Sequence, residues 1–527
     1  MSSASSQDAG PAAAASARAP PLRRLTRARC VTAGGALLVA AIASALFFHR
    51  LGESSLHGDE ALHAQVARES AERDGWLPPT YSGRPYVNKP PLKILAVAWI
   101  FGRFGVSELH ARVLDASCGV ATAVVVFLFG RRLWGAAAGG LAALLLITAE
   151  HYVFAHGVRA GVQDSALVLA TTLTLAFYFL YRERRRGGGR RGWPLLLSAG
   201  IAAGCGGLVK GPVIGLALAV VAAWELAPLL RGRRPRLAGL GVLTVLAAAP
   251  YLAWLAAANE WTGGRLGRLL YQELVVRNTA GLDPGHLHGP LFYPSVLGDD
   301  FGLWLLALLP ALVALTRWRA PQAPALATAP DEAARDRRAV SFVGLWAALL
   351  LAIPSLSPSK LSWYIYPAYP ALALLCARGT AEAVRRAGRS RLLAAALVAL
   401  VAFGLWQRVD SVRERAGREP WVIPAHRYAR AIADLPAFLL IVEPHPGYRP
   451  WDLFYLRPLG TRRRRLPPAI MRPIPNVCRF LVRGSREVPP GVVIERRPEF
   501  AARPLAKDGG KPRGFLLDLD ACIPVWS

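Results

Sequence analysis

Long apolar runs separated by short polar segments set the pattern of this 527-residue chain. Each run is about 15–22 residues long, the length of a helix that crosses a hydrocarbon core roughly 30 Å thick. Apolar and polar residues do not alternate within the runs as they do in membrane barrels, so the runs predict helices. They lie near residues 31–49, 112–129, 133–149, 164–181, 193–209, 211–229, 237–257, 297–315, 340–354, 361–377 and 391–406.

One more candidate, LKILAVAWIFGRF at 92–104, decides the topology, because its crossing would reverse the side of every later loop. Its longest uncharged stretch, Ile94–Gly102, has only nine residues. That stretch is too short to cross the membrane, so we expect an interfacial helix in the first external loop. The pattern therefore predicts an all-α polytopic membrane protein with about eleven spans, and at most about thirteen.

The chain carries 63 Lys and Arg against 34 Asp and Glu, a net charge of +29. In a soluble protein this excess would suggest nucleic acid. Here most of it lies in short Arg clusters between apolar runs, as in cytoplasmic loops, so we expect no nucleic-acid partner. With eleven spans, the N-terminus is cytoplasmic together with the clusters Arg131/Arg132, 182–191, 231–236, 317–338 and 378–391.

The pattern divides the chain into three parts. Residues 1–30 predict a disordered basic cytoplasmic tail. Residues 31–406 hold the apolar runs, with a polar external loop at 50–111. Residues 407–527 leave the membrane pattern and predict a small α/β domain outside the cytoplasm. Its elements would be a helix near 425–434, a strand at Phe438–Glu443 and apolar runs at 478–482, 491–495 and 515–519.

The external loop contains two groups suited to chemistry. Asp59 and Glu60 open a helix-like stretch, and a carboxylate just outside the bilayer can serve as a general base. A helix N-cap is an equally good interpretation of Asp59. Lys89 precedes Pro90 and Pro91, which fix it rigidly at a helix N-terminus, a natural phosphate site. Taken alone, Lys89 is more often a lysine that snorkels to the interface.

Further charges lie at the same predicted membrane edge. Arg159 and Asp164 precede one span, Lys210 interrupts two apolar runs, and Lys360 lies near the aromatic Tyr364. Each has a structural explanation: an interfacial ion pair, a tight turn and an aromatic belt anchor, respectively. Their convergence on one face nevertheless predicts an anion-handling active site. The sequence lacks a Gly-rich phosphate loop, GxSxG and HExxH, which disfavours nucleotide-driven pumps, serine hydrolases and zincins.

These residues form an ordered series that resembles the membrane-embedded GT-C glycosyltransferases, which use polyprenyl-phosphate sugars. The most similar groups are bacterial lipid A aminoarabinose transferases (ArnT-like), with protein O-mannosyltransferases more distant. The resemblance covers about residues 30–380. The series runs through Asp59-Glu60, Arg68-Glu69, Pro85-Tyr86, Lys89-Pro90-Pro91, Arg159…Asp164, Leu208-Val209-Lys210-Gly211-Pro212 and Lys360-Leu361…Tyr364…Pro367.

The resemblance implies roles for these positions. Asp59 would be the catalytic base, with Asp164 and Glu60 as further active-site acids. The lipid-linked phosphate of the donor would be bound by Lys89, Tyr86, Arg159, Lys210, Arg277, Lys360 and Tyr364. The partners would be a polyprenyl-phosphate-sugar donor, an acceptor such as lipid A, another glycan or a protein, and the lipid bilayer. The location would be a bacterial inner membrane, with the active site and C-terminus periplasmic.

The sequence predicts neither a metal site nor a cysteine motif. Relatives often hold a divalent metal through a Glu before the lysine and a His in a later loop, but here the positions are Asn88 and Leu274, so we predict no metal site. The six cysteines include no CxxC pair, so zinc ribbons and redox motifs are unsupported. Cys478 and Cys522 could form a disulfide if their region lies outside the cytoplasm.

Two other classes of function are open to such a chain. A transporter or flippase of a lipid-linked saccharide should have broken spans, midplane charges and internal repeats. No repeat is visible, and the charges gather at one edge. A scaffolding membrane protein would leave the polar loop at 50–111 unexplained.

Overall fold

The computed structural model describes residues 21–418, apart from 57, 74, 82, 187–191, 236, 272–275, 277–283, 310–329 and 389. Beyond residue 418 it describes eight short strands. Several predicted features therefore lie outside the described residues, namely the first part of the N-terminal tail, the helix near 425–434, Leu274, Arg277, Cys478 and Cys522.

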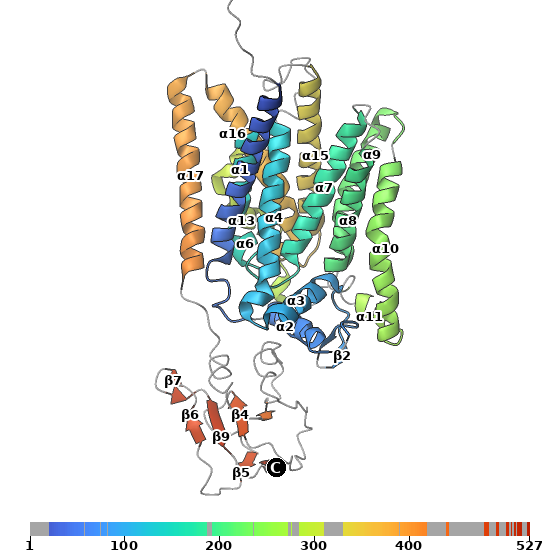
Figure 1. The fold of residues 1–527 in the computed structure, drawn as a ribbon, viewed down its shortest axis with the longest axis vertical. Coiled ribbons are helices and arrows are strands. Elements are labelled where there is room, and N and C mark those ends of the chain that lie inside the picture. The colour runs from blue at the N-terminus through green and yellow to red at the C-terminus, as the bar shows by residue number, and fades with distance from the viewer. Residues whose placement is uncertain are drawn as a thin grey trace, which may run out of the picture.

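The described part is mostly helical, and its long helices form one bundle (Figure 1). The helices that correspond to the first predicted apolar runs are α1 (Pro21–Phe48), α4 (Glu108–Trp134), α5 (Ala136–Ile147), α7 (Asp164–Arg186) and α8 (Trp193–Lys210). The later ones are η2 (Gly211–Ile214), α9 (Gly215–Leu226), η3 (Ala227–Arg231), α10 (Ala238–Trp261), α13 (Phe292–Phe301), η6 (Gly302–Ala307), α15 (Pro330–Ser355), η8 (Ser362–Ala368), α16 (Tyr369–Ala387) and α17 (Arg391–Gly417). Here α marks an α-helix and η a 3₁₀ helix.

Six stretches among the described residues are long and apolar enough to cross a membrane, fewer than the eleven predicted spans. Two of the predicted runs, 193–209 and 211–229, form one apolar stretch of 38 residues, Trp193–Leu230. Helix α5 has only 12 residues and rises about 18 Å, less than a hydrocarbon core. The six stretches are Cys30–Phe48, Glu108–Trp134, Asp164–Arg186, Trp193–Leu230, Ala238–Trp261 and Glu332–Ser355.

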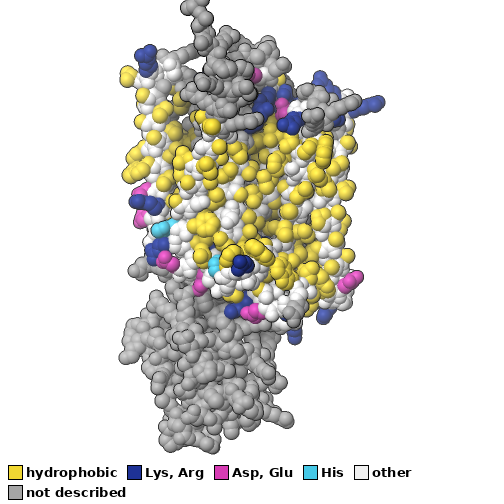
Figure 2. Space-filling view, viewed as in Figure 1, with side chains coloured by type: hydrophobic (Ala, Val, Ile, Leu, Met, Phe, Trp, Pro, Cys, Tyr) yellow, Lys and Arg dark blue, Asp and Glu magenta, His cyan; other side chains and the backbone are white. Residues whose placement is uncertain are grey.

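Hydrophobic side chains cover the middle of the bundle, while charged side chains gather toward its two ends (Figure 2). This banded surface is what a bilayer requires of a protein that spans it. Inside the bundle, large buried side chains such as Tyr152, Phe179, Phe342 and Trp346 belong to one continuous hydrophobic cluster. Helix α4 lies centrally, because it packs against α1, α5 and α7.

One end of the bundle carries the Arg clusters. Arg335 donates to the carbonyl of Arg132, Arg338 pairs with Glu183 at 2.7 Å, and Arg378 pairs with Asp336 at 2.8 Å. These contacts join the ends of α4, α7, α15 and α16, so clusters that are far apart in the sequence lie together.

The polar loop covers the opposite end of the bundle as a small layer of its own (Figure 1). It contains α2 (Gly58–Ala71), the two-residue strands β1 (Thr80–Tyr81) and β2 (Arg84–Pro85), and α3 (Leu92–Phe104). Alanines and Val66 of α2 pack against Ile94, Val97 and Phe101 of α3 in a separate hydrophobic cluster. Helix α3 has only 13 residues and lies at the bundle end, and its place at the membrane interface stays a prediction.

Two short helices connect the bundle at this end, namely α6 (Glu150–Phe154) and α11 (Leu266–Leu270), together with η5 (Pro284–His286). Beyond residue 418, four of the eight described strands overlap the predicted strand and apolar runs at 438–443, 478–482, 491–495 and 515–519, and the other four were not predicted. In one sheet the order is β3 (Leu439–Ile441), β4 (Arg479–Arg483), β9 (Gly514–Asp518) and β6 (Ala502–Pro504), with β3 and β4 parallel. Two further antiparallel pairs are β5 (Val492–Ile494) with β10 (Pro524–Trp526), and β7 (Lys507–Asp508) with β8 (Lys511–Pro512).

Candidate active site

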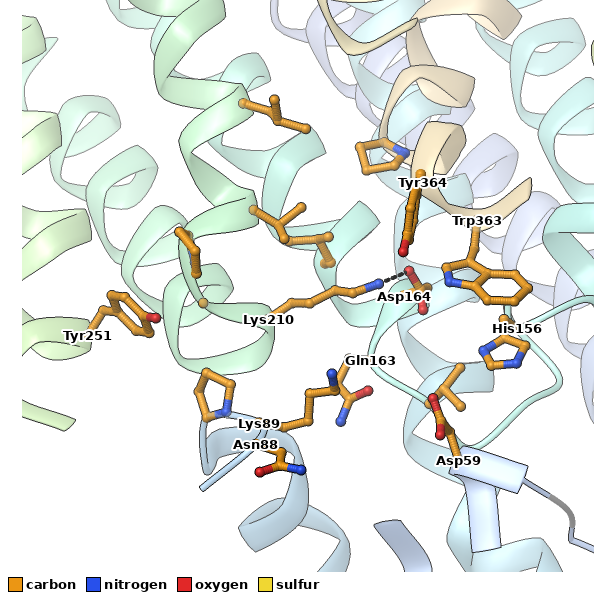
Figure 3. Close-up of a pocket in the computed structure, with 18 of the residues that line it drawn as sticks. Asp59, Asn88, Lys89, His156, Gln163, Asp164, Lys210, Tyr251, Trp363 and Tyr364 are labelled. Atoms are coloured by element: carbon orange, nitrogen blue, oxygen red, sulfur yellow. Dashed lines mark hydrogen bonds and ion pairs between the residues drawn. The ribbon is translucent and has the colours of Figure 1, made fainter. Parts of the chain in front are cut away.

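A cavity of about 400 Å³ opens between the bundle end and the polar loop. Five of the residues predicted from the sequence line it, although they come from five different segments (Figure 3). They are Asp59, Lys89, Asp164, Lys210 and Tyr364. The fold therefore brings together two carboxylates, two lysines and a phenol at one membrane edge.

Asp59 lies in the first turn of α2, where the chain enters the helix through Gly58 with φ 54°. Its side chain is exposed to the cavity. Among the described residues, its carboxylate has no hydrogen-bond or ion-pair partner. A carboxylate that is not engaged by the protein is free to accept a proton from a bound molecule.

The two lysines approach the cavity from different sides. Lys210 is the last residue of α8, and its ammonium forms an ion pair with Asp164, the first residue of α7 (Figure 3). The chain turns after Lys210 at Gly211, whose φ of 65° suits glycine. Lys89 stands before the first turn of α3. Two cations at the edge of an apolar bundle favour an anion, because the low dielectric there strengthens their attraction.

An aromatic pair forms another part of the wall. The rings of His156 and Trp363 stack with centroids 3.8 Å apart and an angle of 13°. Together with Gln163 they line the cavity, and none of the three was predicted from the sequence. Trp363 precedes the predicted Tyr364, so an aromatic run pointed near it. His156 and Gln163 lie in an irregular loop, and no sequence pattern identifies them.

Four predicted residues do not line the cavity. Glu60 is 4% exposed and binds Arg112, while Tyr86 is buried in the cluster between α2 and α3. Arg159 donates to the carbonyls of Leu46 and Phe47 at the end of α1, and burial lowers its pKa to about 10. Lys360 donates to the carbonyls of His288 and Ser357. Arg277 lies outside the described residues.

The described residues contain no group of three or more His, Cys, Asp or Glu that could hold a metal ion. Asn88 lines the cavity next to Lys89 and offers only an amide oxygen. Leu274, the second position that the family resemblance pointed to, is not described. The prediction of no metal site therefore stays a prediction.

Comparison with solved structures defines the class of the fold. ArnT from Cupriavidus metallidurans in the apo state superposes with a TM-score of 0.64 at 19% identity, over 92% of this chain and 98% of that one. The same protein bound to undecaprenyl phosphate gives 0.60 at 20% identity, and the archaeal oligosaccharyltransferase AglB from Archaeoglobus fulgidus gives 0.55 at 12% over 81% and 63%. The chain thus has an ArnT-like fold.

Sequence comparison is more specific. Residues 63–258 match the family model of dolichyl-phosphate-mannose-protein mannosyltransferase. The undecaprenyl phosphate-alpha-4-amino-4-deoxy-L-arabinose arabinosyl transferase of Pseudomonas aeruginosa (strain LESB58) is 29% identical over 65% of this chain and 59% of its own length. The enzyme of the same name from Pseudomonas savastanoi pv. phaseolicola is 30% identical over 68% and 63%. The chain spans about three fifths of the length of these curated relatives. The resemblance to GT-C glycosyltransferases is confirmed.

Proposed function

We propose that this protein is a membrane glycosyltransferase that moves a sugar from a polyprenyl-phosphate donor to a hydroxyl of a lipid, glycan or protein. The observation that carries the proposal is the cavity, which is lined by Lys89, Lys210 and the Asp59 carboxylate, a group without a partner among the described residues. This is the combination that glycosyl transfer from a lipid phosphate requires: a base for the acceptor and cations for the leaving phosphate.

In this mechanism an acceptor hydroxyl attacks the anomeric carbon of the donor sugar. A new carbon–oxygen bond forms there, the bond from that carbon to the phosphate oxygen breaks, and the hydroxyl proton passes to Asp59. Lys89 stabilises the negative charge that grows on the departing polyprenyl phosphate. Lys210, held by Asp164, adds a second positive charge, and Tyr364 offers a hydroxyl donor.

The remaining predicted residues take supporting parts. Lys360 anchors the entry to η8 through two carbonyls, and so supports Tyr364. Arg159 caps the carbonyl end of α1 beside the cavity loop. Arg277 is proposed as a further phosphate contact from the family resemblance alone.

We place the cavity on the periplasmic face of a bacterial inner membrane, with the N-terminus in the cytoplasm. The clustering of Arg residues at the opposite bundle end supports this orientation, because cytoplasmic loops are rich in Lys and Arg. In the same proposal the eleven apolar runs cross or enter the membrane, and residues 407–527 form a periplasmic α/β domain.

The direct test is Asp59→Asn, which keeps the shape of the side chain and removes the base. Loss of general-base catalysis should slow transfer by on the order of 10²–10⁴-fold. The protein would be expressed in a strain that lacks its own copy, and glycolipids and glycoproteins would be compared by mass spectrometry. Glu53→Gln is the matched control, because Glu53 is a solvent-exposed acid of the same loop that pairs only with Arg50 among the described residues.

The outcome separates the candidate functions. An enzyme gives a sugar-modified acceptor that is present with wild type and Glu53→Gln and absent with Asp59→Asn. Full transfer by Asp59→Asn would show that Asp59 is not the base. A flippase would show donor movement across the membrane and no dependence of the modified acceptor on this carboxylate.

A further inference from the structure

Arg112 makes an unusually complete set of contacts beneath the cavity. Its guanidinium is buried, and all five of its N–H groups have an acceptor. Nε and Nη2 donate to the two carboxylate oxygens of Glu60, at 2.6 and 2.9 Å. The other three donate to the carbonyls of Leu51, Ser54 and Ser55, at 2.9, 2.8 and 3.1 Å. Arg112 therefore fixes Glu60 and the entry to α2 at once.

The same Glu60 carboxylate reaches a third segment. Its Oε1 accepts the backbone N–H of Gly161, at 2.8 Å. The carbonyl of Gly161 in turn accepts from Lys93 of α3, which also pairs with the buried Asp115 of α4 at 3.1 Å. Residue 161 is thus held at both of its polar backbone groups by side chains from the polar loop.

The position has no room for a side chain. A Cβ on Gly161 would lie 2.9 Å from the carbonyl oxygen of Ala111 and 3.2 Å from Cγ of Glu60. Real Cβ atoms are seldom found this close to other atoms, so any other residue would push the loop away from Glu60.

We call the contacts that join Arg112, Glu60 and the Gly161 peptide the clamp. The clamp connects the segments that carry the two cavity acids, Asp59 and Asp164. Asp59 immediately precedes Glu60 in α2, and Gly161 is followed closely by Gln163 and Asp164. Glu60 itself does not line the cavity. We propose that Glu60 is a positioning residue, clamped by Arg112, that fixes Asp59 relative to Asp164 by gripping the Gly161 peptide.

The catalytic part of this inference rests on the proposed function, in which Asp59 accepts a proton while Lys210, paired with Asp164, faces the phosphate. A displacement of about 1 Å between such groups can reduce a rate by about 10²-fold. Binding of the lipid phosphate depends on Lys89 and Lys210, which are not part of the clamp. Loosening the clamp should therefore lower kcat and leave phosphate binding intact.

The test uses the full-length protein in detergent with Glu60→Gln, which replaces one acceptor oxygen by an NH2 group that opposes the Arg112 N–H groups. Three measurements are compared with wild type: hydrogen exchange in the peptide covering 155–163, binding of undecaprenyl phosphate, and kcat for transfer to the acceptor found by mass spectrometry. We expect faster exchange in 155–163, a kcat at least about tenfold lower, and a Kd for undecaprenyl phosphate within about twofold of wild type.

Two further variants keep the test decisive if Glu60→Gln fails to fold. Gly161→Ala displaces the loop without changing Glu60 or Arg112. Arg112→Lys keeps the positive charge but removes the guanidinium that donates to both carboxylate oxygens of Glu60. Both should reproduce the three results. The double variant Arg112→Lys/Glu60→Gln should have a kcat close to that of either single variant, because both substitutions break the same contact between Arg112 and Glu60.

Glu225→Gln is the matched control. Glu225 is equally buried and pairs with Arg182 at 2.6 Å. Arg182 lies about 27 Å along α7 from Asp164, at the other end of the bundle. This control should leave kcat and the exchange of 155–163 unchanged.

Three outcomes would overturn the proposal: unchanged exchange and kcat in Glu60→Gln, the same losses in Glu225→Gln, or loss of undecaprenyl phosphate binding with unchanged exchange. The last would mean that Glu60 touches the ligand. A wild-type protein that neither binds this lipid nor transfers a sugar would refute the proposed function instead. In that case the exchange data would still report on the clamp.

Discussion

At the scale of single residues, His63 shows how closely the cavity wall is built. It lies one helical turn after Asp59 in α2 and is only 3% exposed. Its Nε2 is 3.3 Å from the amide nitrogen of Gln163, a donor, so the ring accepts there and is neutral. Burial, followed by the charges of Lys93 and Lys89, holds the pKa of His63 well below its usual 6.5. His63 is thus a neutral, buried side chain that joins α2 to the loop containing Gln163.

This residue makes stability depend on pH. Below about pH 6.5 the unfolded chain binds a proton at His63 that the folded protein refuses, so stability falls as the pH is lowered through that range. We expect the melting temperature of wild type to drop between about pH 7.5 and 5.5, and the drop to be smaller in His63→Gln. Thermal unfolding in detergent measures both. His49→Gln, at an exposed site, should melt with the wild-type pH dependence. An equally steep drop in His63→Gln would refute the assignment.

At the scale of elements, η8 (Ser362–Ala368) organises one side of the cavity. It presents Trp363 and Tyr364 to the cavity, and it directs Tyr366 into the bundle. The hydroxyl oxygen of Tyr366 is 2.6 Å from two carbonyl oxygens, those of His151 and Ala155, which share its single proton. This contact fastens the turn that places His156, with its φ of 55°, against Trp363.

Tyr366→Phe should therefore weaken the protein and disturb the stacked pair. The part-buried carbonyls of His151 and Ala155 lose the Tyr366 proton, and among the described residues only that of His151 keeps another donor, the Ala155 N–H, so we expect a cost of about 1–3 kcal/mol of unfolding free energy. Thermal unfolding, together with exchange in 155–163, measures the effect. Tyr271→Phe removes a hydroxyl from a ring that is 59% exposed and should be neutral. If both variants melt alike, the hydroxyl of Tyr366 does not fasten the turn.

The elements also show what a sequence can predict and what it cannot. Helices followed from the apolar runs, and Asp164 and Lys210 followed from charges beside those runs. Asp59 and Lys89 followed from a polar loop whose residues resemble a known family. The part played by Glu60 did not follow, because its partners Arg112 and Gly161 are 52 and 101 residues away. His156 and Trp363 meet only in the folded chain. Contacts at such separation leave no periodic pattern in the sequence.

At the scale of the whole molecule, the bundle has two unlike ends. One end holds the cavity and the polar loop, and the other joins the Arg clusters through pairs such as Arg338 with Glu183 and Arg378 with Asp336. A membrane protein is oriented with its Arg-rich ends in the cytoplasm. The banded surface in Figure 2 and the separation of these ends therefore predict which end faces out.

Cysteine labelling tests this orientation. In a background without the native cysteines, Arg103→Cys at the cavity end and Arg185→Cys at the end of α7 each place one thiol at an exposed site. We expect a membrane-impermeant maleimide to label Arg103→Cys in intact cells with the outer membrane made permeable, and Arg185→Cys only after the inner membrane is broken. Because Arg103 lies in α3 at the cavity end and Arg185 lies at the far end of α7, the two thiols must report opposite sides of the membrane. The reverse result would put the cavity in the cytoplasm, where the outward-facing acceptor of the proposed reaction is absent, and would require a different acceptor.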